Sequence, residues 1–329
     1  MRAFVVEHDG DQVTSGVRDV DDDQFLADGV VTVEVQWSCL NFKDAMVLRP
    51  RSPVARRSPL IGGVDAAGVV SASADPAVAV GAVVAVHGFG LGTAAHGGFA
   101  ARLRCPGTWV QVLPEGLDAR GAMAYGTAGY TAMASMQALE RNGVAPGSGE
   151  VLVTGASGGV GSVAVALLAA RGYEVTAMTG KADEHEHLVA LGAARVVGRD
   201  DLDDRPERVL GAERLAGAVD CVGGETLARI LRVTRWGGAV AASGLVGGAG
   251  LETTVYPFIT RNVALLGIDS VSAPPAVRDA TWRALASALP AASRDALVSA
   301  EIGLGQIADA LGDLDEGRSR GRVLVDPTR

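Results

Sequence analysis

The stretch Val151-Leu-Val-Thr-Gly-Ala-Ser-Gly-Gly-Val-Gly-Ser162 joins a short apolar run to a glycine-rich turn, and an alanine-rich helical pattern follows. A strand, a tight turn and a helix N-terminus in succession form a geometry that binds a diphosphate. In the dinucleotide-binding register, Ala156 stands at the first glycine position, Gly158 lets the backbone approach the diphosphate, and Gly161 allows close helix–strand packing. No Gly-Lys-Ser/Thr follows, which argues against a phosphate-binding loop of the nucleotide-hydrolase type. Because a second strand pattern follows at residues 174–178, we favour a dinucleotide site over a purely structural glycine turn.

Composition and charge exclude several classes of protein. The chain has 329 residues, enough for two domains with substantial cores. Its net charge of −9 argues against a nucleic-acid partner, although it leaves room for a local basic patch. No apolar stretch reaches the ~18 residues of a membrane span, and no secretory pattern follows Met1. Three scattered cysteines suit neither a disulfide framework nor a structural zinc site, so we expect a cytoplasmic protein.

The pattern of the chain changes near residue 120. Before it, short strand patterns separated by glycine and proline predict a β-rich unit, and Val31-Thr-Val-Glu-Val-Gln-Trp37 alternates with the period of a half-buried strand. After it comes a helical pattern over residues 122–141, interrupted at 126–129. Strands then alternate with helices, which predicts a doubly wound parallel sheet. The strands expected in these two parts are residues 3–7, 30–37, 68–72, 83–87, 151–154, 174–178, 195–197, 217–221 and 238–243.

The C-terminal part returns to the first pattern. Residues 263–269 and 322–325 are expected to be strands, and residues 275–288 and 307–316 helices. We therefore predict an α/β protein in which a Rossmann-type domain (121–262) is inserted into a β-rich domain (1–120 and 263–329).

The end of the second strand of the dinucleotide-binding domain indicates the cofactor. NAD-binding domains carry an acid there for the ribose 2′-hydroxyl, but this chain has Ala177-Met-Thr-Gly-Lys181. The hydroxyl of Thr179, the amide of Gly180 and the cation of Lys181 suit a 2′-phosphate, with Arg199 as a further candidate. Asp183 lies past the strand end. We predict NADPH, the alternative being that Lys181 is a solvated surface residue.

Several blocks resemble the zinc-free medium-chain dehydrogenase/reductase superfamily, in its acryloyl-CoA reductase (NADPH) branch, also called the YhdH/YhfP quinone-oxidoreductase-like group. They are the glycine turn, Ser38-Cys-Leu-Asn-Phe-Lys-Asp44, Gly62-Gly-Val-Asp-Ala-Ala-Gly68, Gly126-Thr-Ala-Gly-Tyr-Thr-Ala132 and Gly267-Ile-Asp-Ser-Val-Ser-Ala-Pro-Pro275. The resemblance covers nearly the whole chain. It implies a GroES-like catalytic domain beside the Rossmann domain, and reduction of an enoyl thioester.

The same resemblance implies a site without a metal. Asn41 and Val64 stand where the zinc alcohol dehydrogenases carry a cysteine and a histidine ligand, and neither side chain suits Zn²⁺. Asp65 stands beside the lost ligand, and we expect it to be structural. His185 and His187 diverge on a helix, so we prefer solvated histidines to metal ligands.

Without a metal, hydride transfer to the electrophilic β-carbon of an enoyl thioester is the favoured reaction. The resemblance implies that Asn41 orients the carboxamide or the substrate carbonyl. Lys43 and Asp44 are either a proton-supplying pair or a structural ion pair. Tyr125 and Tyr130 could also donate a proton, though buried packing is the preferred role, and water could serve.

The resemblance also implies further cofactor contacts, residue by residue. The diphosphate would be held by the turn, Phe42 would contact the nicotinamide end, and residues after the last strands would approach or close over the nicotinamide. These residues are Ser157, Gly158, Gly159 and Val160 for the diphosphate, and Gly244, Leu245, Phe258 and Ser270 for the nicotinamide.

The segment Arg49-Pro-Arg-Ser-Pro-Val-Ala-Arg-Arg57 carries four arginines and no acid. Arginine presents a planar fork suited to phosphate, and coenzyme A carries three phosphate groups. We hypothesise that this segment, named the arginine loop, docks CoA through Arg49, Arg51, Arg56 and Arg57. The alternative is an exposed loop that serves solubility.

Two other functions stay open. The first is an NADPH-dependent quinone or small-enone reductase, which would not need the arginine loop. The second is a non-catalytic NADPH-binding protein. We further expect a homodimer, formed through edge strands of the Rossmann domains with help from the apolar residues 251–259.

Overall fold

The computed structural model describes residues 1–26, 29–202 and 208–329. The chain divides into two compact units: unit 1 is Met1–Thr127, Ser270–Ser287 and Arg294–Arg329, and unit 2 is Ala128–Asp269 and Ala288–Ser293. Unit 1 holds mainly antiparallel sheets and unit 2 a parallel sheet, which confirms the predicted α/β class. The predicted domain boundaries differ from the boundaries of these units. Residues 121–127 belong to unit 1 and residues 263–269 to unit 2.

Unit 1 contains two sheets. The smaller has the strand order β2–β1–β4, and the larger the order β15–β16–β3–β5–β6–β8, with β7 also paired to β3. Alternating apolar residues along β3 bury one face, as its period of two predicts. The strands are β1 (Arg2–Asp9), β2 (Gln12–Asp19), β3 (Val31–Cys39), β4 (Leu60–Ile61), β5 (Asp65–Ser73), β6 (Val83–His87), β7 (Arg102–Cys105), β8 (Val110–Val112), β15 (Val298–Gly303) and β16 (Arg322–Asp326).

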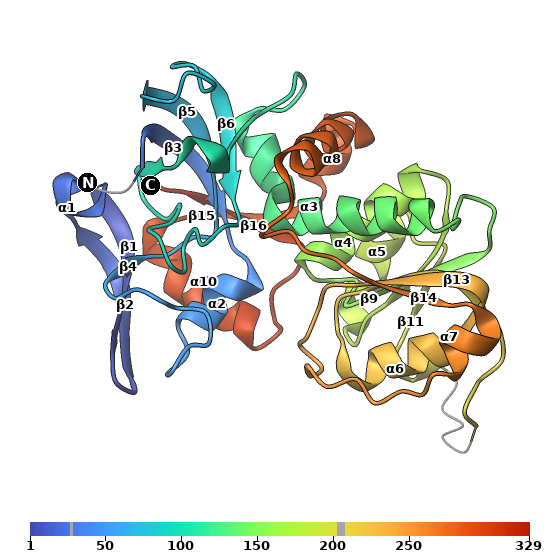
Figure 1. Cartoon of the computed structure of the whole chain (residues 1–329). Coiled ribbons are helices and arrows are strands. Elements are labelled where there is room, and N and C mark those ends of the chain that lie inside the picture. The colour runs from blue at the N-terminus through green and yellow to red at the C-terminus, as the bar shows by residue number, and fades with distance from the viewer. Residues whose placement is uncertain (27–28, 203–207) are drawn as a thin grey trace. The chain divides into compact units, whose positions relative to one another are not determined.

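Short helices cover these sheets. α2 and α10 lie side by side (Figure 1) and share a core cluster with Phe4, Leu60 and Phe99. The helices that lie in unit 1 or cross its limits are α1 (Asp22–Phe25), α2 (Phe42–Val47), η1 (Gly107–Trp109), α3 (Ala119–Arg141), α8 (Pro275–Ala288), α9 (Ala291–Asp295), η4 (Leu304–Gln306) and α10 (Ile307–Asp315).

Unit 2 is a six-stranded parallel sheet of order β11–β10–β9–β12–β13–β14. The order reverses between β9 and β12, and α4 and α5 cover one face while α6 and α7 cover the other (Figure 1). In sheets of this kind, ligands bind at the carboxyl ends of the strands beside such a reversal. The elements are β9 (Glu150–Thr154), α4 (Gly159–Ala170), β10 (Glu174–Met178), η2 (Ala182–Glu184), α5 (His185–Ala190), β11 (Arg195–Val197), η3 (Arg199–Asp201), β12 (Leu215–Asp220), α6 (Gly224–Val233), β13 (Thr234–Ala242), α7 (Tyr256–Arg261) and β14 (Ala264–Gly267).

α3 is interrupted at one residue. Gly126 has φ 54° and ψ −158°, whereas the sequence pattern places the interruption at residues 126–129. A Cβ at Gly126 would lie 2.6 Å from Oδ2 of Asp65 and 2.7 Å from Sγ of Cys39, so the helix can approach these two residues only because position 126 is glycine. Within the described ranges, no helix has both the length and the apolar character that a membrane crossing requires.

Candidate functional site

The glycine turn of unit 2 begins directly after β9. Gly155 has φ 57°, and its carbonyl accepts a hydrogen bond from the Gly158 N–H at 2.9 Å. A Cβ at Gly161 would lie 2.3 Å from the Gly155 carbonyl oxygen, so α4 can start this close to the turn only with glycine there. The absence of a side chain at this position brings the first turn of α4 directly against the end of β9.

The N-terminus of α4 has the properties of an anion site. Its cap residue, Gly158, offers no side chain, and the first turn carries no acid. Within the described part of the chain, the N–H groups of Gly159 and Val160 therefore have neither an intrahelical nor a side-chain acceptor. Nearby, the hydroxyls of Ser157 and Thr179 lie 3.1 Å apart and join this turn to the end of β10. A diphosphate fits such a helix start.

The turn after β10 brings cations to the neighbouring strand end. The Thr179 N–H donates to the Val197 carbonyl at 3.0 Å, and the Thr179 hydroxyl accepts from the Lys181 N–H at 3.2 Å. A Cβ at Gly180 would lie 2.6 Å from Nε of Arg199, which means that the Arg199 guanidinium rests against this glycine. Two basic residues thus flank the turn where an acid would bind a ribose 2′-hydroxyl.

Thr154 and Asp220 connect β9 and β12 where the strand order reverses. The Thr154 hydroxyl donates to Oδ1 of Asp220 at 2.7 Å, and Oδ2 accepts from the Gly223 N–H at 2.8 Å. Burial raises the pKa of Asp220, although its hydrogen bonds with Thr154 and two backbone amides oppose the shift. Sequence reasoning missed both residues. The signal that could have indicated them is a polar residue at the last position of a strand that is otherwise buried and apolar.

The predicted nicotinamide contacts lie in both units. Gly244 follows β13, and a Cβ there would lie 1.9 Å from the carbonyl carbon of Cys221, so this position also requires glycine. Leu245 is half exposed. Phe258, in α7, packs partly buried against the core cluster of the parallel sheet. Ser270 begins the C-terminal part of unit 1.

A buried polar cluster lies in unit 1, centred on Asp65. Its Oδ2 accepts from Nδ2 of Asn41 and the N–H of Thr127, both at 2.8 Å, and its Oδ1 accepts from the Thr127 hydroxyl at 2.6 Å. Nδ2 of Asn41 also donates to the Cys39 carbonyl at 3.3 Å. Because both amide hydrogens of Asn41 have partners, contact with a substrate would have to use its oxygen.

Arg322 completes this cluster from the final strand. Only 2% of it is exposed, and it donates to Sγ of Cys39 at 2.8 Å and to the Leu40 carbonyl at 3.2 Å. Sγ of Cys39 lies 3.1 Å from Oδ2 of Asp65, so the thiol links the arginine to the carboxylate. Burial raises the pKa of Cys39, and the Asp65 carboxylate raises it further, which keeps it a thiol. The sequence analysis did not identify Arg322. The signal that could have indicated it is a charged residue at the first position of an otherwise buried strand.

Asp44 fastens the start of α2. Its Oδ2 accepts from the Asn41 N–H and its Oδ1 from the Val64 N–H, both at 2.9 Å. Burial raises the pKa of Asp44 from 3.8 to about 7, and the neighbouring Asp65 adds to the shift. Lys43 is partly exposed and forms no ion pair with any described residue. The structural ion pair between Lys43 and Asp44, one of the two alternatives, is therefore not formed.

The four loop arginines differ in their partners. Arg49 binds Asp315 of α10 and lies over the Phe42 ring at 5.3 Å. Arg51 forms two hydrogen bonds with Asp11, at 2.5 and 2.8 Å. Arg57 is partly buried. Arg56 is exposed, and its side chain has no polar partner among the described residues.

The remaining candidates are two tyrosines considered as proton donors and two histidines considered as metal ligands. Tyr125 and Tyr130 are buried, and burial raises the pKa of Tyr125 to about 12, which makes it a weak acid. His185 and His187 lie in α5, the first exposed and the second partly exposed. Over the residues that the structure describes, no three His, Cys, Asp or Glu side chains are grouped as metal ligands would be.

Known proteins resemble this chain in sequence and structure. A family model described as zinc-binding dehydrogenase matches residues 159–289, a range that excludes Asn41 and Val64. The acrylyl-CoA reductase AcuI of Ruegeria pomeroyi is 45% identical over 298 residues, which cover 91% of this chain and 90% of the relative. The crystal structure of the YhdH oxidoreductase from Salmonella enterica in complex with NADP has a TM-score of 0.95 at 43% identity, over 99% of both chains.

A third relative is YhfP of Bacillus subtilis, provisionally named a quinone oxidoreductase. It is 42% identical over 98% of both chains, and its crystal structure with NAD bound has a TM-score of 0.95 over 99% of this chain and 98% of that chain. The chain belongs to the medium-chain dehydrogenase/reductase superfamily, in the family of the AcuI acrylyl-CoA reductases and the YhdH/YhfP quinone-oxidoreductase-like proteins. The predicted family membership is confirmed.

Proposed function

We propose that this protein is an oxidoreductase that uses NADPH to reduce the carbon–carbon double bond of a short α,β-unsaturated acyl-CoA. The observation that carries the proposal is the basic turn after β10, where the Arg199 guanidinium rests against Gly180 beside Lys181, in a chain 45% identical to an acrylyl-CoA reductase. Basic groups at this position favour a 2′-phosphate over a free hydroxyl. One relative has NADP bound and another NAD, so the preference between the two cofactors is the quantity to measure.

The residues of unit 2 fit NADPH. The uncapped start of α4 and the close approach at Gly161 leave room and donors for the diphosphate, which Ser157, Gly158, Gly159 and Val160 would hold. Thr179, Gly180, Lys181 and Arg199 would hold the 2′-phosphate. Bound NADPH supplies a hydride from its nicotinamide ring. Gly244, Leu245, Phe42, Phe258 and Ser270 are the proposed contacts of that ring.

The reaction needs a hydride at the β-carbon of the acyl group and a proton at its α-carbon. Negative charge develops on the thioester oxygen in between, and fixed hydrogen-bond donors would stabilise it. We assign Lys43 to this role or to proton supply, because it is partly exposed and has no ionic partner among the described residues. Asn41 and Asp44 would keep α2 in place, since their polar groups are engaged by Asp65, Val64 and each other.

Docking of the CoA phosphates is assigned mainly to Arg56, which is exposed and whose side chain has no polar partner among the described residues. Arg49 and Arg51 already have carboxylate partners, and an arginine that is already paired has less to gain from a phosphate. The arginine-loop hypothesis is thereby narrowed from four arginines to a main docking role for Arg56.

The test is the rate of NADPH oxidation with acryloyl-CoA, crotonyl-CoA and a simple quinone under matched conditions. The proposal expects the highest kcat/KM for one of the two CoA thioesters. A higher value for the quinone would support the second candidate, a quinone or small-enone reductase, which the name of YhfP favours. No turnover with any acceptor would support a non-catalytic NADPH-binding protein.

We also propose a homodimer with a cytoplasmic location. β14 is the last strand of the parallel sheet and pairs with β13 alone among the described strands, so its other edge offers unpaired backbone groups. Val255, Tyr256 and Ile259 near this edge strand in sequence are exposed apolar residues. Sedimentation velocity should give a molecular mass of twice 33.5 kDa, and the mass of a monomer would refute the proposed dimer. All three cysteines are free thiols, as is usual in the cytosol.

A further inference from the structure

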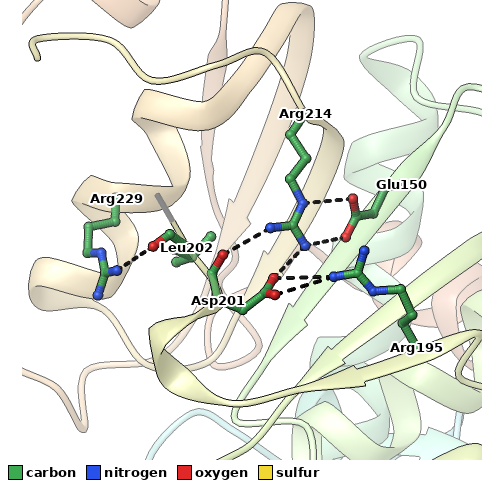
Figure 2. Close-up of polar contacts among 6 residues, drawn as sticks. All are labelled: Glu150, Arg195, Asp201, Leu202, Arg214 and Arg229. Carbon is green, nitrogen blue, oxygen red and sulfur yellow. Dashed lines mark hydrogen bonds and ion pairs between the residues drawn. The ribbon is translucent and has the colours of Figure 1, made fainter. Parts of the chain in front are cut away.

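Four charged residues of unit 2 form a connected network (Figure 2). Arg214 forms a fork with Glu150, with Nε donating to Oε2 at 2.9 Å and Nη2 to Oε1 at 2.8 Å. Nη2 of Arg214 also lies 2.6 Å from Oδ2 of Asp201, and Nη2 of Arg195 lies 3.4 Å from both oxygens of the same carboxylate. The network contains two arginines and two acids, so its formal charges balance.

The network fixes the end of η3. Arg195, the first residue of β11, and Arg214, which directly precedes β12, both contact Asp201, and Glu150, the first residue of β9, holds Arg214. The backbone is held as well, since Nη1 of Arg214 donates to the Asp201 carbonyl at 3.1 Å and Nη2 of Arg229 to the Leu202 carbonyl at 2.6 Å (Figure 2). Leu202 itself is buried in the core of unit 2.

Arg199 is the first residue of the same three-residue 3-10 helix. A turn this short has little stability of its own and depends on what anchors its ends. The preceding Gly198 is extended and free of steric constraint, so it does not fix the direction of Arg199. The segment that carries Arg199 is thus held on both sides: the Val197 carbonyl before it accepts from the Thr179 N–H at 3.0 Å, and Asp201 is anchored after it.

The charge of the Asp201 carboxylate is compensated within the network. Arg214 and Arg195 both form ion pairs with it. The side chains of Arg214 and Glu150 are mostly buried, so this pair is less screened than a surface ion pair. The hydrogen bond with Glu150 raises the pKa of Arg214, in line with a firmly held ion pair.

We infer that Asp201, held by Arg214, is a positioning residue for cofactor selectivity: it holds Arg199 where the 2′-phosphate of NADPH binds, without itself touching the cofactor. The inference rests on the proposed use of NADPH. It assigns part of the discrimination between NADPH and NADH to an ion-pair network on the strands rather than to the phosphate-binding turn.

The test compares the Kd values for NADPH and NADH of the full-length wild type with those of Asp201→Asn and Asp200→Asn. Both variants remove one negative charge from the same turn, but Asp200 is exposed and has no partner among the described residues. Asp201→Asn should raise the Kd for NADPH by about three- to tenfold, the range expected for a weakened charge-assisted contact, and leave that for NADH within about twofold. Asp200→Asn should leave both within about twofold.

A double-mutant cycle separates positioning from damage to the fold. In an Arg199→Ala background, Asp201→Asn should have no further effect on the Kd for NADPH, because the residue through which it acts is gone. Additive effects, or an equal loss for NADPH and NADH, would overturn the inference. If Asp201→Asn folds poorly, Arg214→Lys answers the same question, since it keeps the charge and loses the fork; unchanged selectivity there also overturns the inference. A wild type without preference for NADPH would instead refute the proposed cofactor.

Discussion

The strand ends of unit 2 and the polar cluster of unit 1 are built in different ways. Around the glycine turn, Gly158, Gly161 and Gly180 carry no side chain, which leaves backbone N–H groups and basic residues accessible at the strand ends. Around Asp65, the chain buries charged and polar side chains that bond mainly to one another, although Nε of Arg322 has no hydrogen-bond partner among the described residues. We propose that the first region binds the cofactor and that the second holds α2 in place. Substitutions in the first should change affinity, and substitutions in the second should change stability.

The largest effect is expected from Arg322→Ala. The variant leaves the buried Asp65 carboxylate without the arginine that reaches it through Cys39, which should cost about 3–5 kcal/mol of unfolding free energy. Urea unfolding followed by circular dichroism measures it. The control is Arg51→Ala, whose side chain is 82% exposed and whose ion pair should be worth about 1 kcal/mol or less. Similar losses for the two variants would contradict the role given to the cluster.

A pH-dependent effect is expected at Asp44. Its pKa is raised from 3.8 to about 7 in the folded protein, so between these values the folded state binds a proton that the unfolded state has lost. The contribution of the protonated carboxyl is complete below about pH 4 and disappears as the pH rises to about 7. Each unit of pKa shift corresponds to ~1.4 kcal/mol of unfolding free energy. As the pH rises through this window, the unfolding free energy of the wild type should therefore fall by up to about 4 kcal/mol relative to that of Asp44→Asn.

Unfolding free energies of wild type and Asp44→Asn at several pH values provide the measurement. The variant has no titrating group at this position, so the difference between the two proteins isolates Asp44 from the other carboxylates, including Asp65. Stability curves that run parallel from pH 4 to pH 7 would show that Asp44 titrates normally.

A smaller effect, confined to the cofactor, is expected from Gly161→Ala. The new Cβ would lie 2.3 Å from the Gly155 carbonyl oxygen, so α4 must move away from the turn. The Kd for NADPH should rise by about 100-fold, because the diphosphate loses its aligned helix start. Gly312→Ala, in α10, is the control, since a Cβ there meets nothing within 4 Å. Isothermal titration should find NADPH affinity unchanged in the control. Unchanged affinity in Gly161→Ala would remove the assigned diphosphate site.

The smallest effect is expected in the arginine loop. Arg56→Ala should raise the KM for an acyl-CoA by about fivefold, the effect of one exposed phosphate contact, and spare the KM for a small quinone. Arg51→Ala should change neither, because Asp11 already engages that guanidinium. Steady-state kinetics on both substrates decide between the CoA site and a loop that serves solubility. The solubility alternative predicts no difference between the two variants.

Local patterns made much of the fold predictable. The strand at residues 174–178, the strand at 83–87 and the helix at 275–288 have the predicted limits, because each is marked by its own periodicity or by flanking glycine and proline. α2 was missed, since six residues are too few to show a helical period. β2 was missed because most of its residues are exposed or partly exposed and polar, which gives no alternation.

The site was predictable only where it is local in sequence. The glycine turn and the basic strand end lie within short segments. Arg322, by contrast, lies 281 residues from Asn41, and the partners of Arg49 and Arg51 are 266 and 40 residues away. No spacing rule connects such residues, so the sequence could show four arginines but not which of them were already paired. Only the folded structure of unit 1 shows that Arg49 and Arg51 have carboxylate partners and that Arg56 does not.

The most direct test of the central claim is to reduce acryloyl-CoA with NADPH carrying deuterium at the transferred position of the nicotinamide. We predict propanoyl-CoA with one deuterium at C3, the former β-carbon, as found by mass spectrometry, and a solvent-derived hydrogen at C2. The absence of propanoyl-CoA, or deuterium at any position other than C3, would contradict the proposed reaction.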